Sequence, residues 1–246
     1  MARRLACVFA HPDDETFAVG GTLARYAAAG VTIDLFCATD GDAGRSSGVP
    51  ISSRAELGAR RRAELGEAAR ILGVASVYSA GHHDGTLHQG DPGPLIGCIV
   101  GFLRRARPDV VITFGPEGAP TGHRDHRAIS RAATAAFFLA GSPTENTEQL
   151  VNGAAPHRAS RLFYTAWEPP PPDAELTLQS VPATLRIDVR AFRDTIIAAF
   201  MAHRTQRDFA QRFMTEALKD VEQYALAAGV PQPSAMTTDL FEGLRS

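Results

Sequence analysis

Short apolar runs alternate with longer amphipathic stretches along most of the chain. Apolar runs that end in polar turns are typical of buried strands, and apolar residues at helical spacing are typical of helices that cover a sheet. The predicted strands span residues 5–10, 31–38, 76–79, 109–114, 161–167 and 184–189. The predicted helices span residues 16–29, 54–72, 94–105 and 128–139, with two more between 191 and 228. This alternation predicts an α/β fold, a Rossmann-like three-layer arrangement with a mostly parallel central sheet.

The first predicted strand ends abruptly in His11 and Pro12, followed by the carboxylates Asp13, Asp14 and Glu15. Acidic residues are favoured at a helix N-terminus by the helix dipole, which would explain the three acids but not the histidine. Alternatively, three adjacent like charges repel one another unless a cation lies among them. Histidine with aspartate, without nearby cysteine, is typical of a catalytic zinc site with three protein ligands and an open position. Both interpretations stay open on this cluster alone.

A second cluster, with His123, Asp125 and His126, follows the strand at 109–114 and opens another helix. If both strands lie in one parallel sheet, both clusters share the edge where ligands bind in α/β folds. Two such clusters favour a metal site over polar surface residues without a function. A catalytic site is favoured over a structural zinc site, because structural sites more often use cysteines. The cysteines lie in apolar runs and are typical of small core residues: Cys7, Cys37 and Cys98.

These motifs resemble the zinc-dependent N-deacetylases of the PIG-L/LmbE type, which remove acetyl from N-acetylated amino sugars and related glycoconjugates. The specific matches are Ala-His-Pro-Asp-Asp-Glu at 10–15 and His-Arg-Asp-His at 123–126. Supporting matches are Thr-Asp-Gly-Asp-Ala-Gly at 39–44, Arg61 with Glu64, Asp84-Gly85, and Ala-His-Arg-Thr-Gln at 202–206. The resemblance therefore spans most of the chain.

The most economical metal site takes His11, Asp14 and His126 as ligands, and the resemblance implies the same set. Zinc held by two histidines and an aspartate lowers the pKa of a bound water to about 7. Asp13 is left beside the metal and is the natural general base for that water. Fe²⁺, Co²⁺ or Mn²⁺ could occupy the same ligands as Zn²⁺.

The remaining residues of the two clusters include a candidate hydrogen-bond or proton donor for the reaction. Water attack on an acetamide passes through an oxyanion, which needs a Lewis acid and a hydrogen-bond donor. We expect His123 to face this oxyanion or to protonate the leaving amine. Asp125 could hold that imidazole in the useful tautomer, as carboxylates do in other His-dependent hydrolases. Glu15 could cap the helix or orient a ligand.

The supporting motifs supply candidates for substrate binding. Asp42, Arg61 and Asp84 are expected to hold sugar hydroxyls or an attached anionic group. His203 could line the pocket or simply pack in the core. Three further histidines are interpreted as loop residues: His82, His83 and His88.

Composition limits the class of protein. The chain has 246 residues, enough for one α/β domain spanning 1–246, and its net charge of −2 does not favour nucleic acid or an anionic membrane surface as a partner. The apolar run before His11 is too short for a signal peptide, and no run is long enough to span a bilayer. We therefore expect a cytoplasmic protein. The resemblance also implies a possible homo-oligomer. Four consecutive prolines at residues 169–172 predict either an extended segment at the rim of the pocket or an oligomer contact.

The expected function is hydrolysis of an N-acetyl or N-acyl group on a small amino sugar or glycoconjugate. An amidohydrolase with the same mechanism could instead act on a non-sugar N-acylated metabolite. A non-catalytic metal-binding protein is a second alternative. A nucleotide-binding Rossmann protein is a third, although the G-x-G-x-x-G fingerprint is missing after the first strand.

Overall fold

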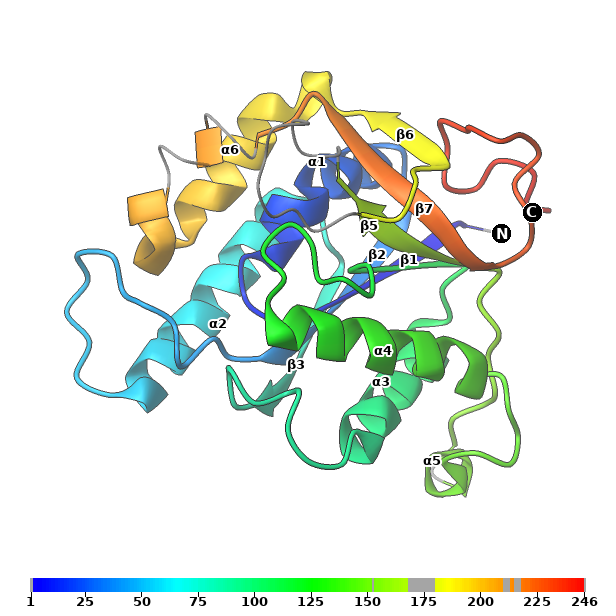
Figure 1. Ribbon diagram of the computed structural model, residues 1–246, viewed down its shortest axis with the longest axis horizontal. Helices are drawn as coiled ribbons and strands as arrows, with labels where there is room; N and C mark the ends of the chain where they lie inside the picture. Colours follow the sequence, from blue (N-terminus) through cyan, green and yellow to red (C-terminus); the bar gives the residue numbers. More distant parts are fainter. Residues whose placement is uncertain (1, 152, 168–179, 210–212, 215–217, 246) are drawn as a thin grey trace.

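The central sheet has seven strands in the order β3-β2-β1-β4-β5-β7-β6 (Figure 1). The computed structural model describes residues 2–151, 153–167, 180–209, 213–214 and 218–245. The strands are β1 (Arg4–Phe9), β2 (Thr32–Thr39), β3 (Ser76–His82), β4 (Val110–Thr113), β5 (Arg161–Ala166), β6 (Leu185–Asp188) and β7 (Val221–Gly229). From one edge, strands β3, β2, β1, β4 and β5 run parallel to one another. Strand β7 runs antiparallel to its neighbours β5 and β6. The prediction of a mostly parallel, Rossmann-like α/β fold is confirmed.

Helices cover both faces of this sheet. They are α1 (Asp14–Ala28), α2 (Arg54–Ile71), α3 (Gly93–Ala106), α4 (Arg124–Leu139), α5 (Thr147–Val151) and α6 (Arg193–Ala202), with 3-10 turns η1 (Arg190–Phe192) and η2 (Arg204–Phe209). Helices α1, α2 and α6 pack together, and α3 packs against α4 on the other side (Figure 1). Right-handed crossovers require this division, because the chain moves outward from β1 to β3 and then returns to β4 and β5. None of the described helices is long and apolar enough to cross a membrane.

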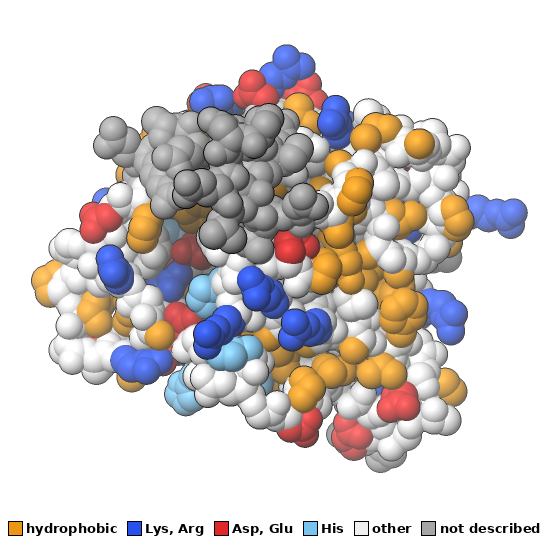
Figure 2. All heavy atoms as spheres, viewed as in Figure 1, with side chains coloured by type: hydrophobic (Ala, Val, Ile, Leu, Met, Phe, Trp, Pro, Cys, Tyr) orange, Lys and Arg blue, Asp and Glu red, His pale blue; other side chains and the backbone are white. Residues whose placement is uncertain are grey.

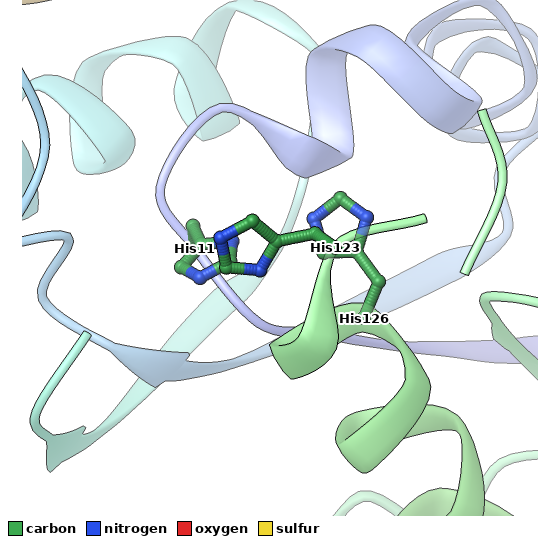
Figure 3. A group of neighbouring side chains, drawn as sticks. All are labelled: His11, His123 and His126. Carbon is green, nitrogen blue, oxygen red and sulfur yellow. The ribbon is translucent and has the colours of Figure 1, made fainter. Parts of the chain in front are cut away.

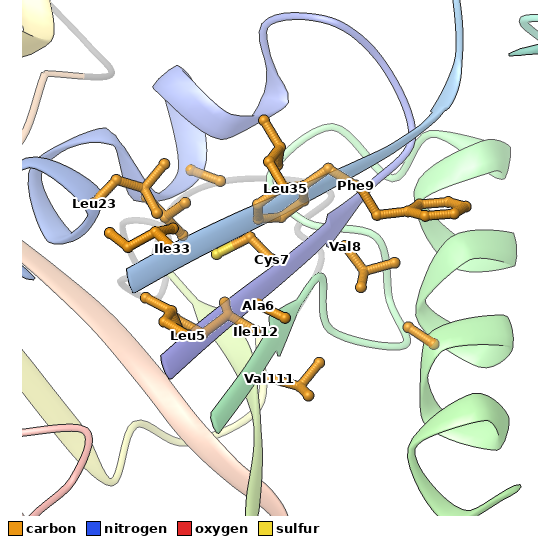
Figure 4. Close-up of a cluster of buried hydrophobic side chains, with 14 of the residues drawn as sticks. Leu5, Ala6, Cys7, Val8, Phe9, Leu23, Ile33, Leu35, Val111 and Ile112 are labelled. Atoms are coloured by element: carbon orange, nitrogen blue, oxygen red, sulfur yellow. The ribbon is translucent and has the colours of Figure 1, made fainter. Parts of the chain in front are cut away.

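The hydrophobic core is centred on β1, which lies between β2 and β4. Its residues from Leu5 to Phe9 are at most 1% exposed. Figure 4 shows them among side chains from α1, β2 and β4, including Leu23, Leu35 and Ile112. A central parallel strand is buried on both faces, which explains why its sequence is continuously apolar rather than alternating.

The prediction of two helices between residues 191 and 228 is wrong at its C-terminal end. Helix α6 ends at Ala202, and residues 221–228 belong to strand β7 instead, while residues 210–212 and 215–217 lie outside the described part of the chain. The alanine-rich sequence of this segment suits a helix, but Glu222 and Tyr224 are buried together at the two-residue spacing of a strand. Pairing with β5 and β6 therefore overrides the local helical preference.

Other boundaries differ by a few residues. Helix α4 begins at Arg124 rather than at 128, because the Nδ1 atom of His123 accepts the main-chain N–H of Asp125 at 3.2 Å and caps the first turn. Strand β3 extends beyond the predicted residue 79, and the loop predicted at 141–160 contains α5. The proline segment at 169–172 lies outside the described residues.

The strand order creates a switch point between β1 and β4. The chain leaves β1 toward β2 on one side, and β4 pairs with β1 on the other. The two crossover directions open a crevice at the carboxyl ends of these strands, where α/β proteins bind ligands. Both His/Asp clusters lie there: residues 11–15 follow β1, and residues 122–127 open α4 after the loop from β4.

Candidate metal centre and active site

Asp14 joins the two clusters at the switch point. Its Oδ2 atom accepts the main-chain N–H groups of Ala10 at 3.1 Å and His11 at 2.8 Å, which fixes the carboxylate across the end of β1. The same carboxylate faces two imidazoles: Oδ1 lies 3.2 Å from Nε2 of His126, and Oδ2 lies 3.5 Å from Nδ1 of His11. All three predicted metal ligands are buried.

These separations fit a shared metal ion. Two ligand atoms about 2.0–2.1 Å from a tetrahedral zinc ion lie roughly 3.4 Å from each other. One side-chain nitrogen from each of His11, His123 and His126 also lies within 4.8 Å of the other two. Figure 3 shows the three rings gathered where the turn after β1 meets the start of α4. The donor set therefore suits a divalent ion with His11, Asp14 and His126 as ligands and His123 beside it.

The second nitrogen of His11 faces two more carboxylates. Its Nε2 atom is buried without a hydrogen bond to any described residue, although Oδ1 of Asp84 lies 3.0 Å away and Oδ2 of Asp125 lies 3.5 Å away. Ligand atoms of these three residues also lie within 4.8 Å of one another. A metal-binding histidine commonly directs its other nitrogen to a carboxylate, so Asp84 and Asp125 are suited to orient the His11 ring.

The charges around the two imidazoles also favour a cation. Burial alone would raise the pKa of Asp14, but the charge of His126 and the contact with His11 hold it well below its usual range. Burial likewise opposes the charge on His11, yet Asp125, Asp14 and Asp84 raise its pKa. Several buried carboxylates around two histidines leave an excess of negative charge that a bound metal ion would balance.

Asp13 lies next to this group in an unusual main-chain conformation. Its φ of 119° and ψ of −26° place it in the left-handed region, which non-glycine residues rarely adopt. Its N–H donates to Oε2 of Glu15 at 3.0 Å, and its carboxylate accepts a hydrogen bond from Nη2 of Arg61 at 3.0 Å. Burial raises the pKa of Asp13 to about 6, although the Arg61 charge opposes this shift. A carboxylate with such a pKa is suited to general-base work near neutral pH.

Arg61 lies behind Asp13 rather than open to solvent. It is 4% exposed, and its guanidinium also donates to the main-chain oxygens of Gly41 and Pro12. The structure thus uses this side chain to support the turn that carries Asp13. Its predicted contact with substrate stays a prediction.

Asp125 has partners that differ from those expected. Its carboxylate accepts the N–H of Gly85 at 2.7 Å and contacts Nδ1 of His88 at 3.2 Å, whereas its link to His123 is through the main-chain N–H. Burial would raise the pKa of Asp125, but the contacts with His11 and His88 lower it to about 2. His88, interpreted from the sequence as a loop residue, therefore contacts the candidate site. Only its closeness to the Asp-Gly pair at 84–85 could have indicated this.

The other predicted residues surround this centre. Oδ1 of Asp42 accepts the N–H of Asp84 at 2.9 Å, and its Oδ2 pairs with Nε of Arg54 at 3.2 Å. Asp42 also lines an open pocket of about 340 Å³ between residues 42–44 and 51–57. His203 is fully buried and contacts Glu15, so its side chain does not reach an open pocket. His123 is exposed, and in Figure 2 histidine side chains reach the surface near the start of α4, where Lys or Arg side chains gather.

Comparison with known proteins identifies the family. Residues 6–137, just over half of the chain, match the family model described as PIG-L, GlcNAc-PI de-N-acetylase. The chain belongs to the PIG-L family. The matched residues include both His/Asp clusters, which follow β1 and β4.

The relatives of this PIG-L protein extend the similarity to the whole chain. It is 33% identical to the 1D-myo-inositol 2-acetamido-2-deoxy-alpha-D-glucopyranoside deacetylase of Rhodococcus erythropolis, over 100% of this chain and 99% of the relative. The fold is similar to that of the N,N'-diacetylchitobiose deacetylase from Pyrococcus horikoshii, with a TM-score of 0.75 and 23% identity. That match covers 92% of this chain and 84% of the Pyrococcus protein. The fold is also similar to that of GalB, the 4-carboxy-2-hydroxymuconate hydratase of Pseudomonas putida KT2440, with a TM-score of 0.71 and 20% identity. That match covers 94% of this chain and 98% of GalB. The fold thus carries more than one chemistry, so function must be argued from the site.

Proposed function

We propose that this PIG-L protein is a metal-dependent deacetylase that removes the acetyl group from an N-acetylglucosamine-containing small molecule. The observation that carries the proposal is the buried group of His11, Asp14 and His126 directly beside Asp13. The deacetylase named for Rhodococcus erythropolis, which aligns along the whole chain, supports an acetamido sugar as substrate.

The reaction is hydrolysis of an amide. A divalent ion, with Zn²⁺ as the expected metal, would lower the pKa of a water molecule and polarise the acetyl carbonyl. Asp13 accepts the proton of the attacking water, for which burial has raised its pKa to about 6. The carbon–nitrogen bond then breaks, and acetate and a free amino sugar leave.

His123 is the candidate donor for the second half of the reaction. It lies at the N-terminus of α4, is exposed, and its ring centroid is 4.8 Å from that of His11. Its Nδ1 accepts a main-chain N–H, so Nε2 carries the proton in the neutral ring. We assign this N–H to the developing oxyanion or to the departing amine.

A pocket beside Asp42 bears on the size of the substrate. The open pocket of about 340 Å³ beside Asp42 is lined by the polar Ser52 and Ser53, whose hydroxyls bond Glu56, and by the apolar Ile51 and Leu57. We assign this pocket to a group attached to the sugar. The same machinery would hydrolyse a non-sugar N-acylated metabolite. A cytoplasmic location, one domain over 1–246 and a possible homo-oligomer stay predictions.

The test is metal content together with amine release from N-acetylglucosamine and simple N-acetylglucosaminides, for the wild type and Asp13→Ala. We expect near one metal ion per chain in both, turnover in the wild type and loss of turnover in the variant. Metal without turnover on any sugar would rule out an acetamido sugar as the substrate and leave the metal centre for other acylated compounds. A protein that neither contains nor takes up metal would overturn the proposal.

A further inference from the structure

A buried contact joins two segments that are far apart in the sequence. Nε2 of His203 lies 2.8 Å from Oε1 of Glu15, and the two side chains are 0% and 1% exposed. His203 directly follows α6, which packs beside α1 (Figure 1). Because a carboxylate only accepts hydrogen bonds, this contact places a proton on Nε2 of His203.

The second oxygen of Glu15 extends this contact to Asp13. Oε2 of Glu15 accepts the main-chain N–H of Asp13 at 3.0 Å, while Oε1 also accepts the hydroxyl of Thr16 at 2.6 Å. Asp13 has the left-handed φ of 119°. Such conformations persist at functional sites only where the surrounding structure holds them in place. Glu15 supplies one of these restraints.

The segment that carries His203 is itself anchored. Two residues further on, Thr205 donates its main-chain N–H and its hydroxyl to the carboxylate of Glu64, with the hydroxyl bond at 2.7 Å. Glu64 lies on α2, one helical turn from Arg61, which holds the Asp13 carboxylate. The main chain and the side chain of Asp13 are thus both fixed from the same group of packed helices.

We infer that Glu15 and His203 are positioning residues, which hold the main chain of Asp13 in the strained conformation that directs its carboxylate at the metal site. The inference rests on the proposed function, because it concerns the same general base. It assigns a role to His203 that differs from packing. Packing alone would be better served by an apolar side chain, since burial of a polar group is unfavourable without partners. Nδ1 of His203 has no hydrogen-bond partner among the described residues, so the contact with Glu15 is what the imidazole contributes.

The test compares His203→Leu with His203→Gln, whose amide can still donate to Glu15. The matched control is Tyr224→Phe, which removes a buried hydrogen bond to Glu222, a carboxylate that also binds the α1 main chain but not Asp13. Four quantities are measured: kcat and KM on an N-acetylglucosaminide, zinc affinity by equilibrium dialysis, and the rate of hydrogen exchange at the Asp13 amide.

His203→Leu is expected to lower kcat by on the order of 10- to 100-fold, the effect of a small misplacement of a catalytic group. KM and zinc affinity stay within about twofold, because the metal ligands do not contact His203. Exchange at the Asp13 amide becomes faster, and His203→Gln recovers part of both effects. Tyr224→Phe leaves kcat and Asp13 exchange at wild-type values.

Unchanged kcat and unchanged Asp13 exchange in His203→Leu would overturn the inference, as would an equal loss of kcat in the control. If His203→Leu does not fold, Glu15→Gln replaces it, because a single amide oxygen cannot accept from Asp13, Thr16 and His203 together. If the wild type hydrolyses no acetamido sugar, the proposed function fails, but the exchange rate of the Asp13 amide still decides whether Glu15 and His203 hold it.

Discussion

The guanidinium of Arg61 donates to the carboxylate of Asp13 at 3.0 Å and to the main-chain oxygen of Gly41 at 2.9 Å. This relationship connects the helix α2 with the turns after β1 and β2. It also explains a glycine: a Cβ atom at residue 41 would lie 2.3 Å from Nη1 of Arg61. The orientation of the candidate base therefore depends on a side chain 48 positions away in the sequence.

Arg61→Lys is expected to lower kcat on an N-acetylglucosaminide by on the order of 10- to 100-fold while metal content is retained. A single ammonium group cannot reproduce the planar fork that reaches Asp13, Pro12 and Gly41 together. At least one buried acceptor stays unpaired, so the free energy of unfolding falls by about 1–3 kcal/mol. Steady-state kinetics and urea unfolding measure both effects. Arg62→Lys on the exposed side of the same helix is the control, and an equal loss there would contradict this role.

Removal of the metal provides a second prediction. A chelator is expected to abolish amine release, and added Zn²⁺ to restore it. Asp14→Asn is expected to weaken metal binding by more than about 10-fold, since even the loss of a residue that only orients a ligand has that effect. Asp40→Asn is the matched control, because Asp40 follows the neighbouring strand and bonds Ser79 and Arg62 instead. Metal content is measured by elemental analysis. If Asp14→Asn binds as much metal per chain as the wild type does, Asp14 is not a metal ligand.

The sequence predicts which residues of the candidate site come together. A continuous apolar run such as residues 5–10 indicates a strand buried on both faces, which is the mark of a parallel sheet covered by helices. Polar clusters after two such runs must then meet at one edge of the sheet. The contacts of Asp14 with His11 and His126 agree with that expectation.

The partners of these residues could not be predicted in the same way. Glu15 and His203 are 188 positions apart, and only the packing of α6 against α1 brings them together. His88 approaches Asp125 because the turn after β3 folds toward α4, which no local pattern indicates. Strand β7 has the alanine-rich composition of a helix, so its pairing with β5 and β6 becomes visible only in the sheet.

Gly21→Ala tests the packing of α1 under the C-terminal part of the chain. A Cβ atom at residue 21 would lie 2.4 Å from Cβ of Val189, so overpacking is expected to lower the free energy of unfolding by about 1–3 kcal/mol. Gly66→Ala is the matched control, since this exposed position in α2 has no atom within 4 Å of the added group. There the substitution is expected to stabilise by about 0.5–1 kcal/mol. Thermal unfolding measures the melting temperature of both variants. If the two melting temperatures change in the same direction, this account is wrong.

Glu222 is a buried carboxylate on β7, and it predicts a pH dependence of stability. Its oxygens accept the N–H groups of Gly21 and Thr22, each at 2.8 Å, and the hydroxyl of Tyr224 at 3.0 Å. Burial raises the pKa of Glu222, and these hydrogen bonds offset the shift only in part. The folded state therefore holds this proton more tightly than the unfolded chain does, where the pKa of a glutamate is about 4.3.

The sign of the effect follows from proton linkage. The stability contributed by protonated Glu222 is fully present below the unfolded pKa and is lost as the pH rises through the higher folded pKa. A glutamine side chain does not titrate, so the advantage of the wild type over Glu222→Gln in unfolding free energy is expected to shrink as the pH rises. Urea unfolding of both proteins at several pH values between about 4.5 and 8 measures this difference, in which all other titrating groups cancel. A difference that stays constant or grows with pH would show that Glu222 is already ionised in the folded protein at the lowest pH, and that its three donors outweigh its burial.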